Sequence, residues 1–548
     1  MSRSTNGFRW RDSVIPVAAS GVLRPVGIGS AARIASALWQ YGPSLATVLA
    51  ISAIRHGDRT ALVDERGAVS YATLQRRTEA IAAALHATRP GAETVAVLCR
   101  NHRGFVEAAV AGAQLGCELV FLNTDLPAAQ LAQILHRHEP DILIHDREYD
   151  AAVIASGYSG TRVHAWTDEA TPGTPSLDSL AQQSNPTPPR VRKSVKITLL
   201  TSGTTGLAKG VSRPISQRVL LEMVATSMSA TRFTSRDVLV LSPPFFHGFG
   251  LAVLTGGLAL GATVITRKRF DPLDALADIQ RHRATVFVGV PIMLQRLLAV
   301  PEHQRREFHT GSLRLAVTGA APITPATISR FLSVFGPILL NGYGSTEAGV
   351  ISIATPEDLA FSPKTAGRPA IGVSVRILRP DRAPAPAGET GTIFVRGGLG
   401  YNGYVAEANS PTPRKEVVDG YVNTGDMGHL DATGRLYVDG RDDDMIVSGG
   451  ENIYPKEVED VLADHPAISE VVVIGVPSEE FGQSLRAYLV PTPGSPDPAP
   501  EDLKAHIRGH LERYKVPKEF IVLDQLPRNP SGKILRAKLI DQPHRTMG

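Results

Sequence analysis

Residues 201–210 have the sequence Thr-Ser-Gly-Thr-Thr-Gly-Leu-Ala-Lys-Gly and directly follow the apolar run 197–200, which is typical of a buried strand. Glycines and small hydroxyl residues allow consecutive backbone N–H groups to converge on an anion, and a lysine adds positive charge. The order is not that of a Walker A loop, because Ala208 precedes the lysine and Gly210 follows it. We predict a phosphate-binding loop formed by Thr201, Ser202, Gly203, Thr204, Thr205, Gly206 and Lys209.

Strand-like and helical runs alternate on both sides of this loop. Strands separated by helices of this length require crossover connections, so we expect a mostly parallel sheet with helices on both faces. The predicted strands are 94–98, 119–122, 142–144, 286–290 and 313–317, and the predicted helices are 72–85, 103–115 and 128–137.

The pattern changes to short strands with turn signals beyond Gly372, which predicts a β-rich subdomain. After Arg441 a smaller α+β unit is expected, with a helix that Pro455 opens. The predicted fold is therefore α/β, with a large N-terminal domain of helix-covered sheets and a small C-terminal domain. The expected boundaries are a leader at 1–44, the large domain at 45–440 and the small domain at 441–548. The short strands are 373–378, 391–395 and 436–438, and the small unit adds strands 470–475, 485–490 and 520–523 and a helix at 501–514.

Composition excludes several classes of protein. A chain of 548 residues with 43% hydrophobic and 20% charged residues is neither disordered throughout nor a polytopic membrane protein. A net charge of +4 over this length gives no nucleic-acid-binding footprint, so no nucleic-acid partner is expected. The 2 cysteines, Cys99 and Cys117, are typical of reduced core thiols in a cytoplasmic protein.

Two segments bear on membrane contact. Residues 30–54 have helical spacing on both sides of Pro43, within an arginine-rich leader whose only acid is Asp12. We predict a helix packed on the core, and leave open a weak contact with a membrane surface. The apolar run 249–265 contains several glycines, which favours a buried helix that leads into a strand. The pattern G-x-G-x-x-A at 27–32 has no strand before it, which predicts a turn.

Two further motifs carry groups that suit a nucleotide. Residues 341–347, Asn-Gly-Tyr-Gly-Ser-Thr-Glu, combine glycines that permit close backbone approach with Tyr343, whose ring can stack on a base. Thr346 can donate to a phosphate oxygen, and the Glu347 carboxylate can bind a hard divalent cation. Asp426, in the sequence Thr-Gly-Asp, is predicted to lie at a turn, where its carboxylate can accept hydrogen bonds from ribose hydroxyls.

The charged segment 440–459 and the C-terminal segment 527–536 complete a set of motifs that resembles the adenylate-forming superfamily. Acyl-CoA synthetases, peptide-synthetase adenylation domains and firefly-type luciferases belong to this superfamily. The resemblance extends from about Ala50 to the C terminus, with the motifs in the order and spacing of the family. It implies that the small C-terminal domain is mobile, with Asp443 as its hinge.

The resemblance also implies the residues of the nucleotide site. Thr346 would contact the α-phosphate, Glu347 would bind Mg²⁺, and Lys533 would bridge the substrate carboxylate and the α-phosphate. The residues implied at adenine and ribose are Gly319, Ala320, Ala321, Asn341, Gly342, Tyr343, Gly344, Asp426 and Arg441.

Sites for CoA and the acid follow from the same resemblance. Backbone without side chains at Gly449 and Gly450, next to Ser448, would form the wall of a narrow pantetheine channel. His247 lies in an aromatic motif at the carboxylate end of the acyl pocket, where it either positions the acid or simply packs. The residues implied near the CoA nucleotide are Tyr514, Lys515 and Lys518.

The expected activity is ATP-dependent activation of a medium- to long-chain fatty acid, as an acyl-adenylate, and its transfer to CoA. A fatty acid is favoured because residues 243–265 contain no charged side chain. The expected small molecules are ATP, Mg²⁺ and CoA. Two alternatives stay open: a fatty acyl-AMP ligase that loads a carrier protein, and a CoA ligase for an aromatic or other non-fatty acid. Luciferase-like oxidation, a silent lipid-binding protein and a homodimer are also left open.

Overall fold

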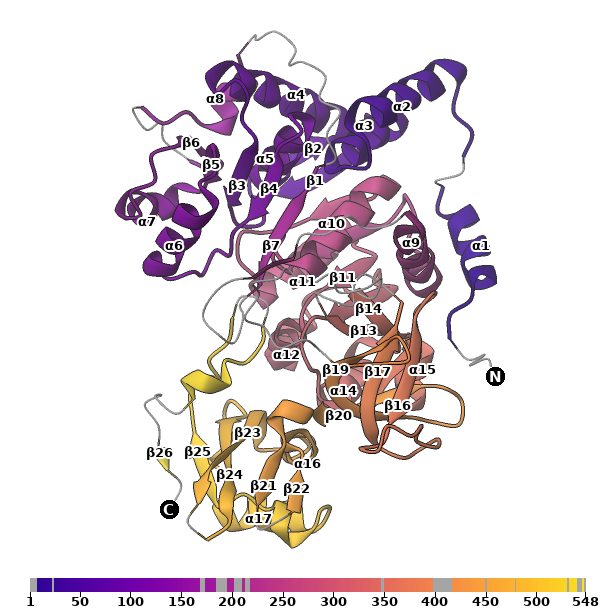
Figure 1. Ribbon diagram of the computed structural model, residues 1–548, viewed down its shortest axis with the longest axis vertical. Coiled ribbons are helices and arrows are strands. Elements are labelled where there is room, and N and C mark those ends of the chain that lie inside the picture. The colour runs from indigo at the N-terminus through magenta and orange to yellow at the C-terminus, as the bar shows by residue number, and fades with distance from the viewer. Residues whose placement is uncertain are drawn as a thin grey trace.

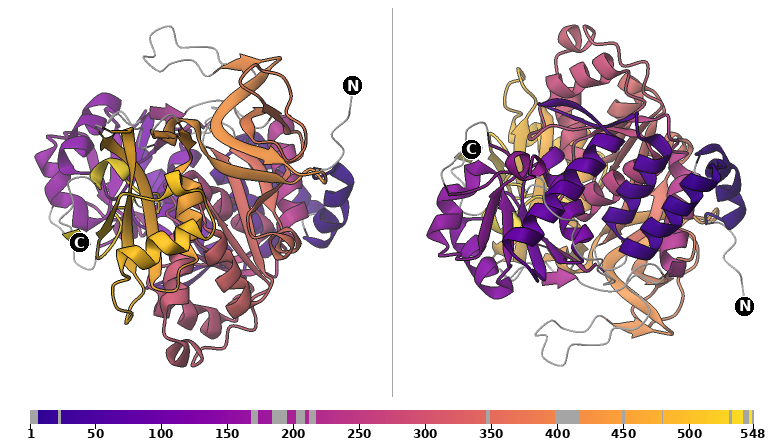
Figure 2. Two further views of the ribbon diagram at one scale, coloured as in Figure 1. Left: turned by 90° about the horizontal axis from the view of Figure 1, so that it is seen from below. Right: turned by 90° about the horizontal axis from the view of Figure 1, so that it is seen from above.

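The computed structural model describes residues 7–21, 24–167, 173–183, 195–201, 209–211, 217–345, 349–397, 416–448, 451–478, 480–529, 532–539 and 545–546. Figure 1 shows a large unit, and below it a small unit formed by the C-terminal part of the chain. Seen from below, the small unit lies in front of the large one (Figure 2, left). Three sheets carry the fold of the described residues.

The first sheet of the large unit has the strand order β6-β5-β3-β4-β7-β8. All its neighbouring strands are parallel except β7 and β8, which form an antiparallel pair. The strands are β3 (Thr94–Leu98), β4 (Glu118–Phe121), β5 (Ile142–His145), β6 (Thr161–His164), β7 (Ile197–Thr201) and β8 (Lys209–Val211).

The long sheet changes character along its width. From β1 to β13 its strands are mainly parallel, and from β14 to β16 they are antiparallel. This confirms the predicted α/β class with a β-rich part. The strands are β1 (Thr60–Asp64), β2 (Gly67–Ser70), β9 (Val238–Leu241), β10 (Thr263–Ile265), β11 (Val286–Val288), β12 (Leu315–Gly319), β13 (Leu339–Ser345), β14 (Gly349–Ala354), β15 (Thr365–Pro369), β16 (Ser374–Leu378), β17 (Gly391–Arg396), β18 (Val417–Val418), β19 (Tyr421–Leu430) and β20 (Leu436–Arg441).

Both sheets are buried on two faces. In β3, Val95 and Val97 belong to one apolar cluster, and Ala96 and Leu98 belong to another, because successive side chains of a strand point to opposite faces. The first cluster also contains residues of the long sheet, so the two sheets share a core. The helices of the large unit are α4 (Tyr71–Thr88), α5 (Arg103–Gln114), α6 (Ala128–His138), α7 (Asp150–Ala155), α8 (Leu177–Ala181), α9 (Gln217–Thr231), α10 (Gly248–Leu260), α11 (Pro272–His282), α12 (Pro291–Ala299), α13 (Glu302–Arg305), α14 (Pro325–Phe335) and α15 (Pro356–Phe361), with the 3-10 turn η1 (Arg147–Tyr149).

The apolar run 249–265 forms α10 followed by β10, as predicted. No helix in the described part of the chain combines the length and the apolar character that a membrane span needs. Cys99 and Cys117 are buried and form no disulfide, which confirms the predicted core position of both.

The leader forms α1 (Trp10–Ala19), α2 (Ile28–Tyr41) and α3 (Leu45–His56). The predicted turn at 27–32 is wrong, because Gly27 caps α2 and the residues after it form the first helical turn. Packing on the core is confirmed for α3, where Leu49 is fully buried. In contrast, α2 leaves Ile28, Leu38 and Trp39 exposed.

The small unit contains a sheet flanked by α16 and α17. Strands β23 and β24 are antiparallel and β24 and β25 are parallel. The helix predicted at 501–514 is too long, because α17 ends at Arg508, before Gly509, a residue with low helix propensity. The elements are η2 (Asp442–Asp444), β21 (Ile446–Ser448), β22 (Glu451–Ile453), α16 (Pro455–Ala463), β23 (Ile468–Ser478), β24 (Gly482–Pro491), α17 (Pro500–Arg508), η3 (Arg513–Lys515), β25 (Glu519–Val522), η4 (Arg536–Lys538) and β26 (Arg545–Thr546).

Candidate active site

The carboxyl ends of the two large sheets meet at the side chain of Asn101. This residue follows β3, and its Nδ2 donates to the carbonyl oxygens of Pro243, at 2.8 Å, and Ser242, at 3.3 Å, in the loop after β9. Its Oδ1 accepts the backbone N–H of Phe245 at 2.8 Å. With 5% of its surface exposed, Asn101 holds the loop that carries His247.

His247 caps α10 at the end of this loop. Its Nδ1 accepts the backbone N–H of Phe249 at 3.4 Å, so the neutral ring carries its proton on Nε2. Burial lowers the pKa of His247, which favours this neutral form at physiological pH. A Cβ at Gly250 would lie 2.2 Å from the carbonyl oxygen of Pro244, so only glycine permits this turn of α10 to pack there. His247 therefore has a structural role as a cap and also a ring N–H to donate.

The predicted phosphate loop connects β7 and β8. Thr201 pairs with Lys209, so the loop is closed at its base by an antiparallel ladder. A Cβ at Gly248 would lie 3.5 Å from Cδ1 of Leu199 in β7, which places the start of α10 beside this hairpin. Ser202, Gly203, Thr204, Thr205 and Gly206 lie outside the described residues.

The predicted adenine residues lie at the end of β12, just after it, and within β13. These two strands are parallel neighbours. Gly319 pairs with Gly342, and a Cβ at Gly319 would lie 2.9 Å from the carbonyl oxygen of Gly342. Ala320 has a φ of 66°, in the left-handed region that costs energy for a residue with a side chain. Such strain is typical of functional sites. Ala320 is exposed and Ala321 follows it directly.

Two buried oxygen atoms at this place have no hydrogen-bond partner among the described residues. They are Oγ1 of Thr318 and Oδ1 of Asn341, which belong to paired residues of β12 and β13. A buried polar atom without a partner costs free energy, so such atoms point to a ligand or water. The amide oxygen of Asn341 suits a donor such as the amino group of adenine. The hydroxyl of Thr318 and the amide of Asn341 therefore suit a nucleotide as ligand.

Tyr343, Asp426 and Arg441 connect the predicted adenine and ribose positions. The hydroxyl of Tyr343 donates to Oδ2 of Asp426, and Nη1 of Arg441 lies 3.8 Å from Oδ1. The prediction that Asp426 lies at a turn is wrong: it lies within β19, paired with Arg441 of β20. The turn-like sequence reflects Gly425, whose φ of 84° distorts the strand. Thr346 and Glu347 lie outside the described residues, and Gly344 is exposed at the end of β13.

The loop that carries Lys533 reaches the large unit. A Cβ at Gly532 would lie 3.1 Å from Cγ2 of Val290 and 3.0 Å from Cγ2 of Ile292, at the start of α12. Arg528 donates to the carbonyl oxygen of Gly532 at 2.7 Å, and the N–H of Lys533 donates to Oδ1 of Asn529 at 2.8 Å. These hydrogen bonds join residues 528 and 529 to residues 532 and 533, and the Lys533 side chain is exposed.

The predicted CoA residues lie elsewhere in the small unit. Ser448 pairs with Gly482, at the start of β24, and the N–H of Lys518 donates to the carbonyl oxygen of Leu485. In contrast, Arg528 of the lysine loop forms an ion pair with Glu470, which is paired with Val490 near the other end of β24. The loop of Lys533 and the predicted CoA residue Ser448 therefore lie near opposite ends of β24.

Lys515, which was predicted to lie near the CoA nucleotide, is largely occupied by contacts within the small unit. Its ammonium group forms ion pairs with Glu457 and Glu512, both at 2.8 Å, and its side chain is 13% exposed. Tyr514 is 42% exposed, and Lys518 is exposed beside the ring of Phe481 at 4.7 Å. Gly449 and Gly450 lie outside the described residues. Lys518 and Tyr514 are therefore more accessible to a phosphate than Lys515 is.

The connection between the two units is short. β20 ends at Arg441, the turn η2 spans Asp442–Asp444, and β21 of the small sheet begins at Ile446. Asp443, the predicted hinge, is the middle residue of this turn.

The sequence alone did not single out two residues that shape this site, Asn101 and Val290. Asn101 lies 141 to 144 residues from its partners, so no local pattern reports its role. Val290 looks like an ordinary strand-end residue, and only its proximity to Gly532 distinguishes it.

Fold and site together define a nucleotide-binding enzyme of the adenylate-forming class. Residues 49–405 match the family model of the AMP-binding enzymes, and residues 457–533 match that of the AMP-binding enzyme C-terminal domain. The chain therefore belongs to the AMP-binding enzyme family, as the motifs predicted. ATP, Mg²⁺ and CoA, the predicted small molecules, are those that adenylate-forming CoA ligases use.

Three similar proteins show the range of this family. The chain is 34% identical over 504 residues to the 3-[(3aS,4S,7aS)-7a-methyl-1,5-dioxo-octahydro-1H-inden-4-yl]propanoyl:CoA ligase of Mycobacterium tuberculosis, covering 88% of this chain and 95% of that protein. It is 36% identical over 347 residues to a long-chain-fatty-acid–CoA ligase of Bacillus subtilis, covering 62% and 60%. The structure of o-succinylbenzoate CoA synthetase of Bacillus subtilis with its acyl-adenylate superposes with a TM-score of 0.74 at 29% identity, covering 91% and 99%.

Tyr343→Phe removes the hydroxyl that holds the Asp426 carboxylate. We expect the KM for ATP to rise about tenfold, because hydrogen bonds to charged groups contribute about 1.5–3 kcal/mol. The measurement is initial-rate kinetics of pyrophosphate release at varied ATP. The matched control is Tyr421→Phe, which removes a hydroxyl hydrogen-bonded to Ser374 in the same sheet. Equal values of KM in the wild type and Tyr343→Phe would contradict the role given to this contact.

Proposed function

We propose that the protein is an acid–CoA ligase that joins a carboxylic acid to CoA through an acyl-adenylate and releases AMP and pyrophosphate. The observation that carries the adenylation half is a group of features at the strand ends that suit a nucleotide. These are the oxygens of Thr318 and Asn341 that lack a partner among the described residues, the strained Ala320, and Asp426 held by Tyr343.

The first half-reaction requires stabilisation of charge more than a protein nucleophile. A carboxylate oxygen of the acid bonds to the α-phosphorus of ATP, and the bond from this phosphorus to pyrophosphate breaks. Negative charge accumulates on the phosphate oxygens, where the ammonium of Lys533 and the N–H groups of the loop 201–210 would stabilise it. Support comes from Gly532, which lies against Val290 and Ile292 and so brings the lysine loop to the large unit.

The second half-reaction requires a different orientation of the small unit. We propose that this unit rotates about Asp443, withdraws Lys533 and presents Ser448, Gly449 and Gly450 to the adenylate. The thiol of CoA then bonds to the acyl carbon, and AMP leaves. The positions of the two sets of residues at opposite ends of β24 support this, since a rigid unit of this shape presents one end at a time.

The acid is proposed to carry a ring system. The fatty acid favoured by the sequence is supported by two relatives: the long-chain-fatty-acid–CoA ligase, which matches 62% of the chain, and a fatty acid–[acyl-carrier-protein] ligase of Streptomyces coeruleorubidus, which matches 88% at 31% identity. The relative with 34% identity, also matched over 88% of the chain, acts on a fused-ring propanoate, and the solved structure holds an o-succinylbenzoyl adenylate. The apolar segment after β9 suits a ring as well as a chain, and the Nε2 proton of His247 would orient the carboxylate. An aromatic or fused-ring acid is therefore the better candidate.

A panel of acids tests this choice. We expect kcat/KM for a hydroxycinnamate, an indole acetate or a bicyclic propanoate to exceed that for octanoate, dodecanoate and hexadecanoate by about tenfold or more, the range that pocket shape supplies. The measurement is CoA-dependent release of AMP together with mass detection of the thioester. Saturated fatty acids as the best substrates would overturn the proposed class of acid but leave the ligase chemistry intact.

Lys533→Ala tests the role of the lysine loop. Removal of one transition-state stabiliser costs about 10²–10³ in rate, so we expect pyrophosphate release to fall by that factor. Thioester formation from supplied acyl-adenylate and CoA is expected to be retained, because the lysine acts only in the first half-reaction.

Lys538→Ala provides the matched control, because this lysine is exposed in η4, close in sequence to Lys533. It is expected to keep both half-reactions. Loss of both half-reactions in Lys533→Ala, with Lys538→Ala unaffected, would contradict the assignment of Lys533 to adenylation.

Three predictions about partners stay proposals. A weak contact of the leader with a membrane surface is consistent with the exposed Trp10, Ile15 and Trp39 on α1 and α2. Transfer to a carrier protein in place of CoA stays the second reading of the acceptor. A homodimer is the third.

A further inference from the structure

Two buried histidines lie side by side away from the nucleotide residues. His145 is the last residue of β5 and His164 is the last residue of β6, and the two are partners in this parallel pair. Their side chains are 0% and 1% exposed, and their rings lie 5.1 Å apart at 85°. The carboxyl ends of neighbouring parallel strands are a common place for bound groups.

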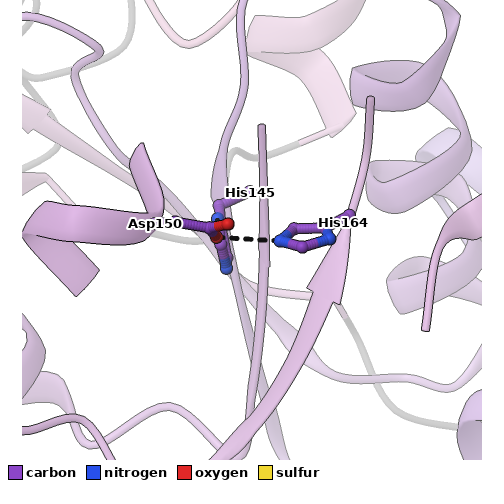
Figure 3. Close-up of side chains that lie close together, drawn as sticks. All are labelled: His145, Asp150 and His164. Carbon is purple, nitrogen blue, oxygen red and sulfur yellow. Dashed lines mark hydrogen bonds and ion pairs between the residues drawn. The ribbon is translucent and has the colours of Figure 1, made fainter. Parts of the chain in front are cut away.

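Asp150 completes a cluster with these histidines. It is the first residue of α7, and Figure 3 shows its carboxylate beside both rings. Oδ1 of Asp150 lies 2.8 Å from Nε2 of His164 and 3.6 Å from Nδ1 of His145. One atom from each residue can be chosen so that all three lie within 4.8 Å of one another. Two imidazoles and one carboxylate therefore converge on one point.

The charge of Asp150 is balanced by no lysine or arginine among the described residues, since its ion-pair partners are the two histidines. The neighbouring carboxylate, Asp146, is already engaged: it contacts Nε2 of His102 and accepts the N–H of Arg100, both at 2.8 Å. A cation at the cluster would balance the Asp150 carboxylate.

We propose that His145, Asp150 and His164 bind one divalent ion of the zinc type. Imidazole nitrogen and carboxylate oxygen are ligands that Zn²⁺ and Co²⁺ favour, whereas Mg²⁺ and Ca²⁺ favour oxygen ligands alone. Zinc bonds of this kind in a tetrahedron place ligand atoms about 3.3 Å apart. The two contacts to Asp150, 2.8 and 3.6 Å, differ from this by a few tenths of an ångström, and the three ligand atoms lie within 4.8 Å of one another, so the two rings would move closer together around an ion. Water would take the fourth position, since the Asp150 side chain is 28% exposed.

The ion would fasten α7 to the ends of β5 and β6, and it is separate from the Mg²⁺ that accompanies ATP. Nδ1 of His145 also lies 3.1 Å from the carbonyl oxygen of Asp146 and donates a proton there in the metal-free form. Binding of the ion displaces the proton on Nδ1 of His145 and the proton that Nε2 of His164 donates to Asp150, and both protons are released. The alternative is a network of hydrogen bonds without metal, in which Asp150 accepts from Nε2 of His164 and His145 donates to the carbonyl oxygen of Asp146.

Cobalt titration of the chelator-treated full-length protein tests the proposal. We expect one Co²⁺ per chain, with the visible absorption typical of a tetrahedral site, and displacement of Co²⁺ by Zn²⁺. We also expect Zn²⁺ to raise the Tm of the metal-free protein, because an ion that binds the native state stabilises it. Failure of the wild type to bind Co²⁺ or Zn²⁺ in this titration overturns the proposal.

Two variants separate the metal site from the hydrogen-bond network. Asp150→Asn keeps an oxygen that can accept the hydrogen bond from His164 but removes the anionic ligand. If the cluster binds metal, the affinity for Co²⁺ falls by at least about tenfold. If the cluster is only a hydrogen-bond network, the Tm of the variant equals that of the wild type. His164→Ala removes a ligand outright, and His136→Ala, an exposed histidine of α6, is the matched control. Equal Co²⁺ affinity in the wild type and Asp150→Asn would also overturn the proposal.

Discussion

The contact between Asn101 and the loop after β9 is the interaction on which the arrangement of the site depends. Parallel strands place all their carboxyl ends at one edge, but this chain has two such edges, in separate sheets. The Asn101 amide bonds to the backbone of Ser242, Pro243 and Phe245, and so joins the two edges. The phosphate hairpin of one sheet and His247 of the other become neighbours for this reason.

The small unit adds a second constraint, since one strand of it carries two sets of functional residues at its two ends. The loop of Lys533 lies near the Val490 end of β24, and Ser448 lies at the Gly482 end. Two chemical steps at the same site require different residues around the substrate in each step. The short turn 442–444 connects the two units, so a rotation of the small unit would occur there. Under the mechanism that we propose, the observed arrangement, with Gly532 against Val290, is the one for the adenylation step.

Local sequence patterns predicted the parts of this protein that depend on local structure. Strand β3, helix α10 and strand β7 before the predicted phosphate loop follow from apolar runs and glycine placement. Prediction failed for features that contacts between distant residues determine. These are the hydrogen bonds of Asn101, the strand conformation of Asp426, and the cluster of His145, Asp150 and His164. The class of acid likewise does not follow from local sequence, because an apolar segment does not define the shape of a pocket.

Transfer of oxygen-18 from the carboxylate of the acid to AMP distinguishes an acyl-adenylate from other activated forms of the acid. If a carboxylate oxygen bonds to the α-phosphorus and the thiol later displaces AMP, one labelled oxygen per turnover must leave with AMP. We expect AMP that carries the label, and unlabelled pyrophosphate, in the mass spectrum of the products. Label in inorganic phosphate released together with ADP would show an acyl-phosphate route and would contradict adenylate formation.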